Sequence, residues 1–161
     1  MLEIKAKLKT RAAAYKLEVK DRLELAFAER SARGALVRLA SGADVKLMLP
    51  AGEVLRGGDL VTASDGRVIE IVAAREKLLH VEGGALAKVA YLLGNHHVPT
   101  QIGDGFLRVP ADPGLEAALP QLGLRVSHVE EPFEPEPVGG HDHGHEHDHD
   151  HDHGHDHGHH H

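Results

Sequence analysis

The first half of the chain is a series of short segments in which hydrophobic and polar residues alternate. Between residues 15 and 74 these segments are YKLEV, LELAF, ALVRLA, DVKLML, LVTA and RVIEIVAA. In DVKLML, Val45, Leu47 and Leu49 occupy every second position, which is the period of a half-buried β-strand. Gly, Ser and Asp residues lie between the segments and favour tight turns. The pattern predicts a small all-β domain over residues 1–74.

A different period begins near Arg75. Residues 84–93 carry hydrophobic residues at three- and four-residue spacing, which predicts a helix with one buried face. These hydrophobic residues are Leu86, Val89, Ala90 and Leu93. Gly94 follows, and glycine is common at the C-terminal cap of a helix. The predicted helix therefore presents His96 and His97 at its C-terminal end.

Turn and capping signals define the rest of the second half. Residues 98–102 and 106–109 predict a hairpin across Gly103-Asp104-Gly105, and Asp112-Pro113 is typical of a helix start. With the flanking strands, the predicted order is strand, helix, strand, strand, helix, strand. This order is typical of a ferredoxin-like fold. The predicted fold class is therefore α+β, with the all-β domain first and a ferredoxin-like βαββαβ domain after it.

Proline and glutamate alternate after the last predicted strand. The residues concerned are Pro132, Pro135 and Pro137, interleaved with Glu131, Glu134 and Glu136. We expect a stiff, solvated linker here, because proline favours extended backbone and nothing in the sequence pairs with the acids. The ordered part is expected to end near Val138. The ferredoxin-like domain is thus predicted over residues 75–138 and a disordered tail over residues 139–161.

The tail consists only of His, Asp, Glu and Gly, with twelve of the chain's 16 histidines, six acids and no Lys or Arg. Its histidines are His141, His143, His145, His147, His149, His151, His153, His155, His157, His159, His160 and His161. Imidazole is a common ligand of nickel, zinc and copper, so the tail is predicted to bind metal. A purification tag is a weaker interpretation, because six carboxylates interrupt the histidines.

Composition excludes several classes of partner. The net charge is −7, but without the tail 19 acids nearly balance the 18 Lys and Arg residues, and aromatic residues are few. A nucleic-acid partner is therefore not expected. The chain lacks a stretch of 18 apolar residues and a hydrophobic leader, so we expect a soluble, cytoplasmic protein and no membrane partner. Without cysteine, metal ligands are restricted to imidazole, carboxylate, backbone and water.

Motifs of catalysis are missing from the sequence. The chain contains no G-x-x-x-x-G-K-[ST] phosphate-binding loop and no H-E-x-x-H helix. The histidines before the tail have no nucleophile at a recognisable spacing. We therefore expect a protein that is not an enzyme.

Three motifs carry a specific resemblance: DGRVIEIVAA at 65–74, GNHHVPTQI at 94–102 and VEEPFEPE at 129–136. Together with the tail they resemble the urease accessory protein E family of nickel metallochaperones. The resemblance implies an N-terminal β domain likened to a co-chaperone peptide-binding module, a ferredoxin-like metal-binding domain and a His-rich tail. It also implies that the protein donates nickel for urease maturation, with the urease accessory GTPase and the urease apoprotein or its accessory complex as partners.

The family's usual motif is GNRHxP, and the resemblance implies that its last histidine, here His97, binds metal at the two-fold axis of a homodimer. His96 departs from the motif, which usually has Arg there, and is a second candidate ligand. Without the resemblance, both would be interpreted as partners of a helix C-terminal dipole. A peripheral histidine pair that some relatives carry near Asp112 is missing here, so that extra site is not expected. His80 and His128 are interpreted as ordinary strand histidines.

The expected function is thus nickel binding and delivery by a homodimer. Two copies of His97 leave nickel short of ligands, so tail histidines or water are expected to complete its coordination. The main alternative is a storage or detoxification protein in which the tail buffers nickel or zinc. A third reading, a peptide-binding co-chaperone, explains the β domain but leaves His97 and the tail without a purpose.

Overall fold

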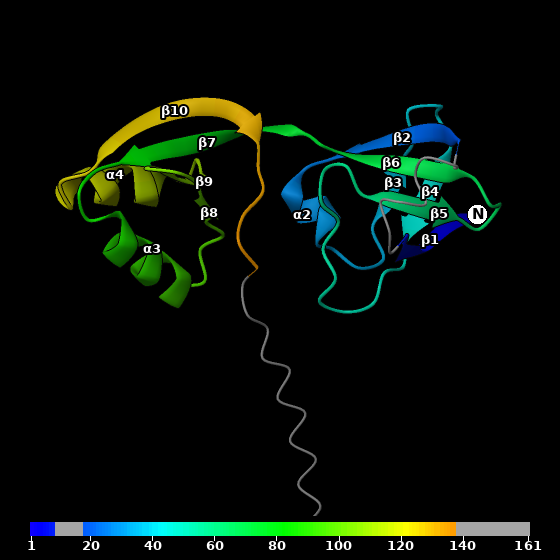
Figure 1. The fold of residues 1–161 in the computed structure, drawn as a ribbon, viewed down its shortest axis with the longest axis horizontal. Coiled ribbons are helices and arrows are strands. Elements are labelled where there is room, and N and C mark those ends of the chain that lie inside the picture. Colours follow the sequence, from blue (N-terminus) through cyan, green and yellow to red (C-terminus); the bar gives the residue numbers. More distant parts are fainter. Residues whose placement is uncertain (9–17, 138–161) are drawn as a thin grey trace, which may run out of the picture.

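The computed structural model describes residues 1–8 and 18–137, and it contains two β-sheets that belong to two domains (Figure 1). Along the chain, strand β6 (Val68–Ala73) is the last strand of the N-terminal sheet, and β7 (Arg75–Glu82) is the first strand of the C-terminal sheet. Each sheet has its own cluster of buried hydrophobic side chains. The α+β fold class and the order of its two domains are confirmed. Within the described residues, no helix is long and apolar enough to cross a membrane.

The N-terminal sheet has six strands in the order β2-β6-β5-β1-β4-β3. Besides β6, its elements are β1 (Leu2–Lys7), β2 (Val19–Leu25), the short helix α2 (Phe27–Arg30), β3 (Leu36–Arg38), β4 (Asp44–Leu47) and β5 (Leu60–Ala63). The alternation predicted for Val45, Leu47 and Leu49 is confirmed, since all three side chains are buried in this core. The core is completed by Ile4 and by alternate residues of the other strands.

Strand β1 was not predicted, although it lies inside the sheet between β5 and β4. Ile4 is fully buried, but Lys5 is exposed and Lys7 is only partly buried, so the two lysines of this six-residue strand obscure the strand pattern. The segments YKLEV and LELAF were predicted as separate strands. Val19 of the first and residues 23–25 of the second belong to the single strand β2, whereas Ala26 caps α2 and Phe27 is the first residue of that helix, so the end of LELAF is not strand. Residues 15–17 of the first lie outside the described residues.

The C-terminal sheet is antiparallel with the order β10-β7-β9-β8, and helices α3 and α4 complete the βαββαβ arrangement. The elements after β7 are α3 (Leu86–Asn95), β8 (Gln101–Ile102), β9 (Leu107–Pro110), α4 (Pro113–Gln121) and β10 (Arg125–Pro132). The start of α4 is as predicted, because the Asp112 carboxylate accepts a hydrogen bond of 2.7 Å from the Gly114 backbone N–H.

Helix α3 buries the predicted face and ends later than predicted. Val89 and Leu93 are buried against the second core, with Leu86 and Ala90 packed beside them. Gly94, the predicted cap, lies inside the helix, and His96 is the C-terminal cap residue. The prediction was wrong because glycine is favoured where the backbone turns left-handed, and here a histidine occupies that position.

The segment after β10, residues 133–137, is not the solvated linker that the prolines and glutamates predicted. Phe133 is 1% exposed, and Pro135 is buried as well. The Glu134 carboxylate pairs with Arg30 of the N-terminal domain at 3.1 Å. This segment, called the strap below, runs between the two domains (Figure 1). Its role depends on pairing with residues far away in the sequence, which composition does not reveal.

Candidate metal-binding helix end

Helix α3 ends in a Schellman motif, in which two backbone hydrogen bonds close the last turn. The His97 N–H donates to the Gly94 carbonyl at 3.1 Å, and the Val98 N–H donates to the Leu93 carbonyl at 2.9 Å. Val98 also packs against the core that contains Leu93, which is the hydrophobic contact that usually accompanies the motif. The motif fixes the backbone on which His96 and His97 are carried.

His97 has a φ of +57°, and it is the one non-glycine residue with a positive φ among the residues that the structure describes. It occupies the position after the cap where a Schellman motif ordinarily has glycine. A left-handed conformation costs an L-residue with a β-carbon about 1–2 kcal/mol. Such strained residues cluster at functional sites, because an ordinary turn has no reason to keep them. The backbone therefore marks His97 independently of any motif.

Both histidines are exposed at the negative end of the helix dipole. His96 has φ −88° and ψ 10°, so its backbone conformation differs from the left-handed one of His97. The last carbonyls of a helix carry a partial negative charge, which favours a bound cation. The last turn contains no Lys or Arg that would compete for this position. The helix end can therefore offer one or two imidazoles to a metal ion.

One chain alone does not bring a full ligand set to this point. Across residues 1–8 and 18–137, His, Cys, Asp and Glu side chains form no group of three that could hold a metal ion. Nickel takes four to six ligands, so further donors have to come from a second copy, from water or from outside the described residues. All twelve tail histidines, His141 to His161, lie outside the described residues.

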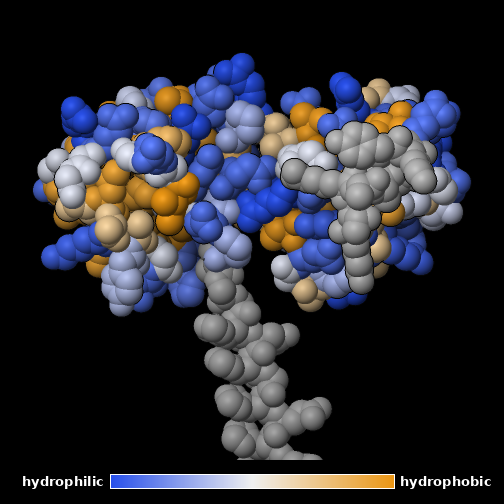
Figure 2. All heavy atoms as spheres, viewed as in Figure 1, coloured by the Kyte–Doolittle hydropathy of each residue, from blue (hydrophilic) through white to orange (hydrophobic). Residues whose placement is uncertain are grey.

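Exposed hydrophobic side chains lie near the helix end. Tyr91 and Leu92 on the last turns of α3 are 73% and 38% exposed, and Ile102 of β8 is 53% exposed. Figure 2 shows hydrophobic surface on the C-terminal domain in the region of its helices. A cavity of about 240 Å³ beside the helix end is lined by Gly94 and Val98 and by the last two strap residues, Glu136 and Pro137. The strap therefore ends next to the histidine-bearing turn.

His80 lies on β7, as predicted, and is already engaged by its neighbours. Its Nε2 lies 3.0 Å from a Glu82 carboxylate oxygen, and its Nδ1 accepts a hydrogen bond of 3.1 Å from Arg108. The ring stacks on Phe106 at 4.7 Å between centroids. Both ring nitrogens are used, so His80 is a structural histidine.

His128 lies on β10, also as predicted, and its Nε2 is 2.6 Å from a carboxylate oxygen of Glu116 on α4. Both side chains are exposed at about half or more of their surface, and the pair is a surface contact between strand and helix. Ala111 and Pro113 flank Asp112, so the helix start carries no histidine pair, as the sequence already indicated.

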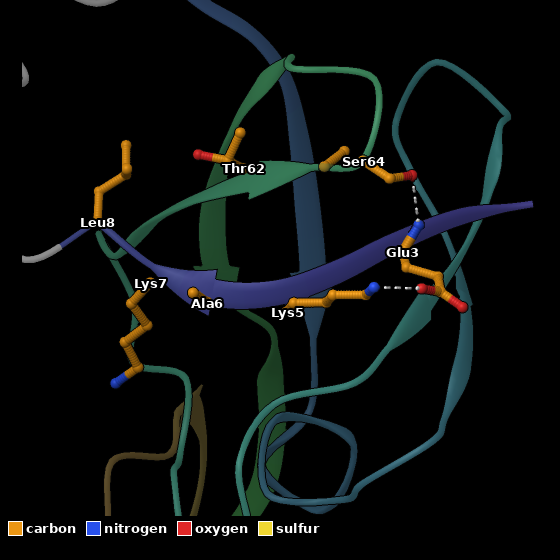
Figure 3. Close-up of a pocket in the computed structure, with 8 residues that line it drawn as sticks. Glu3, Lys5, Ala6, Lys7, Leu8, Thr62 and Ser64 are labelled. Carbon is orange, nitrogen blue, oxygen red and sulfur yellow. Dashed lines mark hydrogen bonds and ion pairs between the residues drawn. The ribbon is translucent and has the colours of Figure 1, made fainter.

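The N-terminal domain has a shallow groove of about 400 Å³ between β1 and β5 (Figure 3). The register of these two paired strands shifts between Ile4 and Lys7, which are paired with Ala63 and Val61. At one end the Glu3 N–H donates to the Ser64 hydroxyl at 3.0 Å, and Lys5 pairs with the Glu3 carboxylate at 3.3 Å. The lining is made of three charged residues, four small residues and Leu8, and the small residues are Ala6, Thr62, Ala63 and Ser64. Such a surface suits contact with another protein better than enclosure of a small molecule.

Comparison with known proteins agrees with this architecture in both domains. The N-terminal domain of the UreE urease accessory protein matches residues 4–74, and its C-terminal domain matches residues 68–161. Proteins named urease accessory protein UreE from Burkholderia vietnamiensis and Ralstonia nicotianae are each 44% identical to this chain, over 127 and 128 residues. These alignments cover 75% and 76% of this chain but 64% and 61% of the relatives, so the chain spans under two thirds of their length. The homologous protein of Cupriavidus necator is 44% identical over 128 residues, with 76% of this chain and 67% of the relative covered. The chain belongs to the UreE urease accessory protein family.

Proposed function

We propose that this protein is a homodimeric nickel chaperone that binds Ni(II) and delivers it to the urease maturation complex for assembly of the urease metallocentre. The observation that carries the proposal is the left-handed, exposed His97 at the end of α3. A histidine at a position where glycine would remove the strain supports a use for its imidazole. The relatives, named urease accessory proteins, support a role in urease maturation.

His97 is proposed as the ligand at a two-fold axis shared by two copies. An isologous contact brings the same residue from each copy together, and the exposed Tyr91 and Leu92 on the same helix would bury apolar surface in such a contact. Two imidazoles leave nickel partly open, with water or tail histidines as further ligands. An open coordination shell suits delivery, because a partner can replace ligands one at a time.

The tail histidines, His141 to His161, are proposed to collect nickel and raise its concentration near His97. A tethered ligand acts at an effective concentration set by the tether and not by the bulk solution. Zinc and copper bind the same imidazoles, so metal identity would come from the delivery partner and not from the tail. The N-terminal domain is proposed to dock the urease accessory GTPase or the urease apoprotein complex. We further propose that the protein acts in the cytoplasm and is not itself an enzyme.

Nickel titration by calorimetry tests this proposal. The three samples are the full chain, a chain that ends at Val138, and that shorter chain with His97→Gly, which removes the imidazole and keeps the backbone that the motif needs. One site per dimer in the shorter chain, lost with the substitution, is the expected result. If the shorter chain binds no nickel, the folded part only carries the tail and storage is the better function.

The storage alternative differs from delivery in its partners. A pure metal buffer has no reason to bind the urease accessory GTPase, whereas a delivery protein has to contact it. We expect a nickel-dependent complex in a pull-down with that GTPase, and sedimentation of the nickel-loaded protein as a dimer. A monomer in the presence of nickel would count against the shared site.

A further inference from the structure

Arg30 is a fully buried arginine, and its guanidinium joins three distant parts of the chain. Its Nε donates to the Leu25 carbonyl at 3.2 Å, and its Nη1 donates to the Leu55 carbonyl at 3.0 Å. The same Nη1 lies 3.1 Å from the Glu134 carboxylate, and Nη2 donates to the Phe133 carbonyl. Two of its four hydrogen bonds therefore depend on the strap.

The Glu134 carboxylate accepts further hydrogen bonds from the N-terminal domain. Arg56 donates from its guanidinium to Oε2 at 3.1 Å, and the Gly57 backbone N–H donates to Oε1 at 2.9 Å. A β-carbon at Gly57 would lie 3.3 Å from Oε1, so glycine permits this close approach. The rings of Phe27 and Phe133 pack edge to face at 5.7 Å between centroids. The strap is thus part of the N-terminal domain's packing.

The strap is held to the C-terminal domain as well. The Glu134 backbone N–H donates to the side-chain oxygen of Gln101 at 3.1 Å, and the Glu136 N–H donates to the Thr100 carbonyl at 2.8 Å. Both acceptors belong to β8 or the residue before it. Thr100 is three residues after His97, so this attachment places the end of the strap beside the metal-binding turn.

We propose that Arg30 and Glu134 form an interdomain lock. The lock holds the two domains in one orientation and fixes, beside His97, the point from which the His-rich C-terminal residues begin. Burying a guanidinium is costly unless its partners are in place, so release of the strap would leave Arg30 with an unpaired charge in the N-terminal core. This cost keeps the strap attached. The second half of the proposal, the placement of the tail, rests on the proposed function.

The lock shortens the tether between the folded protein and the first tail histidine, His141. With the strap attached, His141 is four positions after Pro137, whereas it is nine positions after Pro132 if the strap is released. For a flexible tether, effective concentration falls as about the −3/2 power of its length, so lengthening the tether from four to nine positions lowers it by about threefold. Arg30 and Glu134 are therefore positioning residues and not metal ligands.

Spin labels can measure the orientation of the domains without nickel. The chain has no cysteine, so Leu36→Cys in β3 and Leu122→Cys after α4, at positions 60% and 54% exposed, place one label on each domain. Labelled full-length chain is diluted with unlabelled chain, and the label separation is measured by double electron–electron resonance. We expect one narrow distance distribution, which Glu134→Gln abolishes.

The matched control is Glu131→Gln, which removes a half-buried carboxylate of β10 that lies 3.9 Å from Arg75. It should keep the narrow distribution. Arg56→Met removes one partner of Glu134 and leaves Arg30 paired, so it should broaden the distance distribution less than Glu134→Gln does. It should also fold, and it therefore still tests the lock if Glu134→Gln does not fold. An unchanged distribution in both Glu134→Gln and Arg56→Met overturns the lock.

Nickel titration of the same full-length variants tests the placement of the tail. We expect Glu134→Gln to weaken the tightest nickel site by up to about threefold, while Glu131→Gln leaves it unchanged. A broadened distance distribution with unchanged nickel affinity overturns the tail placement and leaves the lock. If His97→Gly also leaves the tightest site unchanged, the proposed function fails, and the spin-label result still decides the lock.

Discussion

At the end of helix α3 the imidazoles of His96 and His97 are exposed, whereas at the strap the guanidinium of Arg30 is fully enclosed. In the first region the histidines are exposed, and His97 has a left-handed backbone. In the second, carbonyl and carboxylate oxygens of the N-terminal domain and of the strap accept hydrogen bonds from the buried guanidinium. The open region is suited to exchange a ligand, and the closed one is suited to hold a geometry.

The comparison shows that the role of a polar side chain depends on whether its hydrogen-bonding atoms are already paired, and not on its residue type alone. Among the buried side-chain nitrogens and oxygens of residues 1–8 and 18–137, none lacks a hydrogen-bond partner. The polar groups that remain free for chemistry are therefore at the surface, and His97 is distinguished there by its backbone. The predictions below test each side of the comparison, beginning with the closed region.

The largest effect is expected for Arg30→Met. The substitution removes four hydrogen bonds and leaves the Glu134 carboxylate without its buried partner. Breaking a buried ion pair from one side typically costs about 3–5 kcal/mol, which urea unfolding followed by circular dichroism will measure. Arg33→Met, at an exposed position three residues further on, is the control and should change the free energy of unfolding by less than about 0.5 kcal/mol. Equal losses in the two variants would contradict a special role for Arg30.

A second closed cluster lies within the N-terminal domain alone. Burial tends to raise the pKa of Asp21, but hydrogen bonds from the Ser41 hydroxyl and from the backbone N–H groups of Arg22 and Ser41, with the charge of Arg67, lower it overall. A carboxyl whose pKa is lower in the folded state stabilises the fold above its unfolded pKa of 3.8. That contribution is lost as the pH falls below 3.8 through the lower folded value.

We therefore expect Asp21→Asn to destabilise the protein at pH 7 by about 1–3 kcal/mol, since hydrogen bonds to a charged group are removed. The difference from the wild type should shrink as the pH is lowered from 5 to 3, as followed by urea unfolding at each pH. The distance between labels on the two domains should not change, because this cluster does not involve the strap. A difference in stability that grows towards acid would contradict the direction of the Asp21 pKa shift.

A smaller effect of opposite sign is expected at the open region. His97→Gly relieves the left-handed strain, and His97→Ala retains it, so the glycine variant should be about 1 kcal/mol more stable than the alanine variant. Thermal unfolding of the metal-free proteins measures this difference. Both variants lose the imidazole, and they should be equally deficient in nickel binding. A more stable alanine variant would mean that the turn does not hold His97 in a left-handed conformation in solution.

The sequence predicted the elements whose signal is local. Helix α3, the Asp112 start of α4 and the order of the C-terminal strands follow from period and capping residues within a few positions. Strand β1 was missed because its lysines hide a single buried isoleucine, Ile4. The strap was missed because Glu134 and Arg30 lie 104 residues apart, so their pairing exists only in the folded chain.

The candidate site was predicted in part. His97 was predicted from a resemblance, and its left-handed backbone is a physical reason to propose a role for it. The residue pattern did not reveal this conformation, because Gly94 led to a predicted helix cap two positions before the observed one at His96. A Gly-Asn-His-His-Val run gives no local sign of which residue turns left-handed. The register of the helix end is set by packing of Leu93 and Val98 into the core, which is a tertiary effect.

The smallest effect is expected for His96→Arg, which restores the residue usual in the family's motif and separates the two adjacent histidines. His96 caps the helix with φ −88°, and His97 follows with φ +57°, so a metal held by one imidazole is not automatically within reach of the other. If His97 alone faces the two-fold axis, calorimetry on the chain that ends at Val138 should give an unchanged nickel affinity. A loss of about tenfold, equal to 1.4 kcal/mol, would instead make His96 a ligand of the same ion. The open region would then supply four imidazoles per dimer, and the need for tail histidines to complete the nickel site would largely disappear.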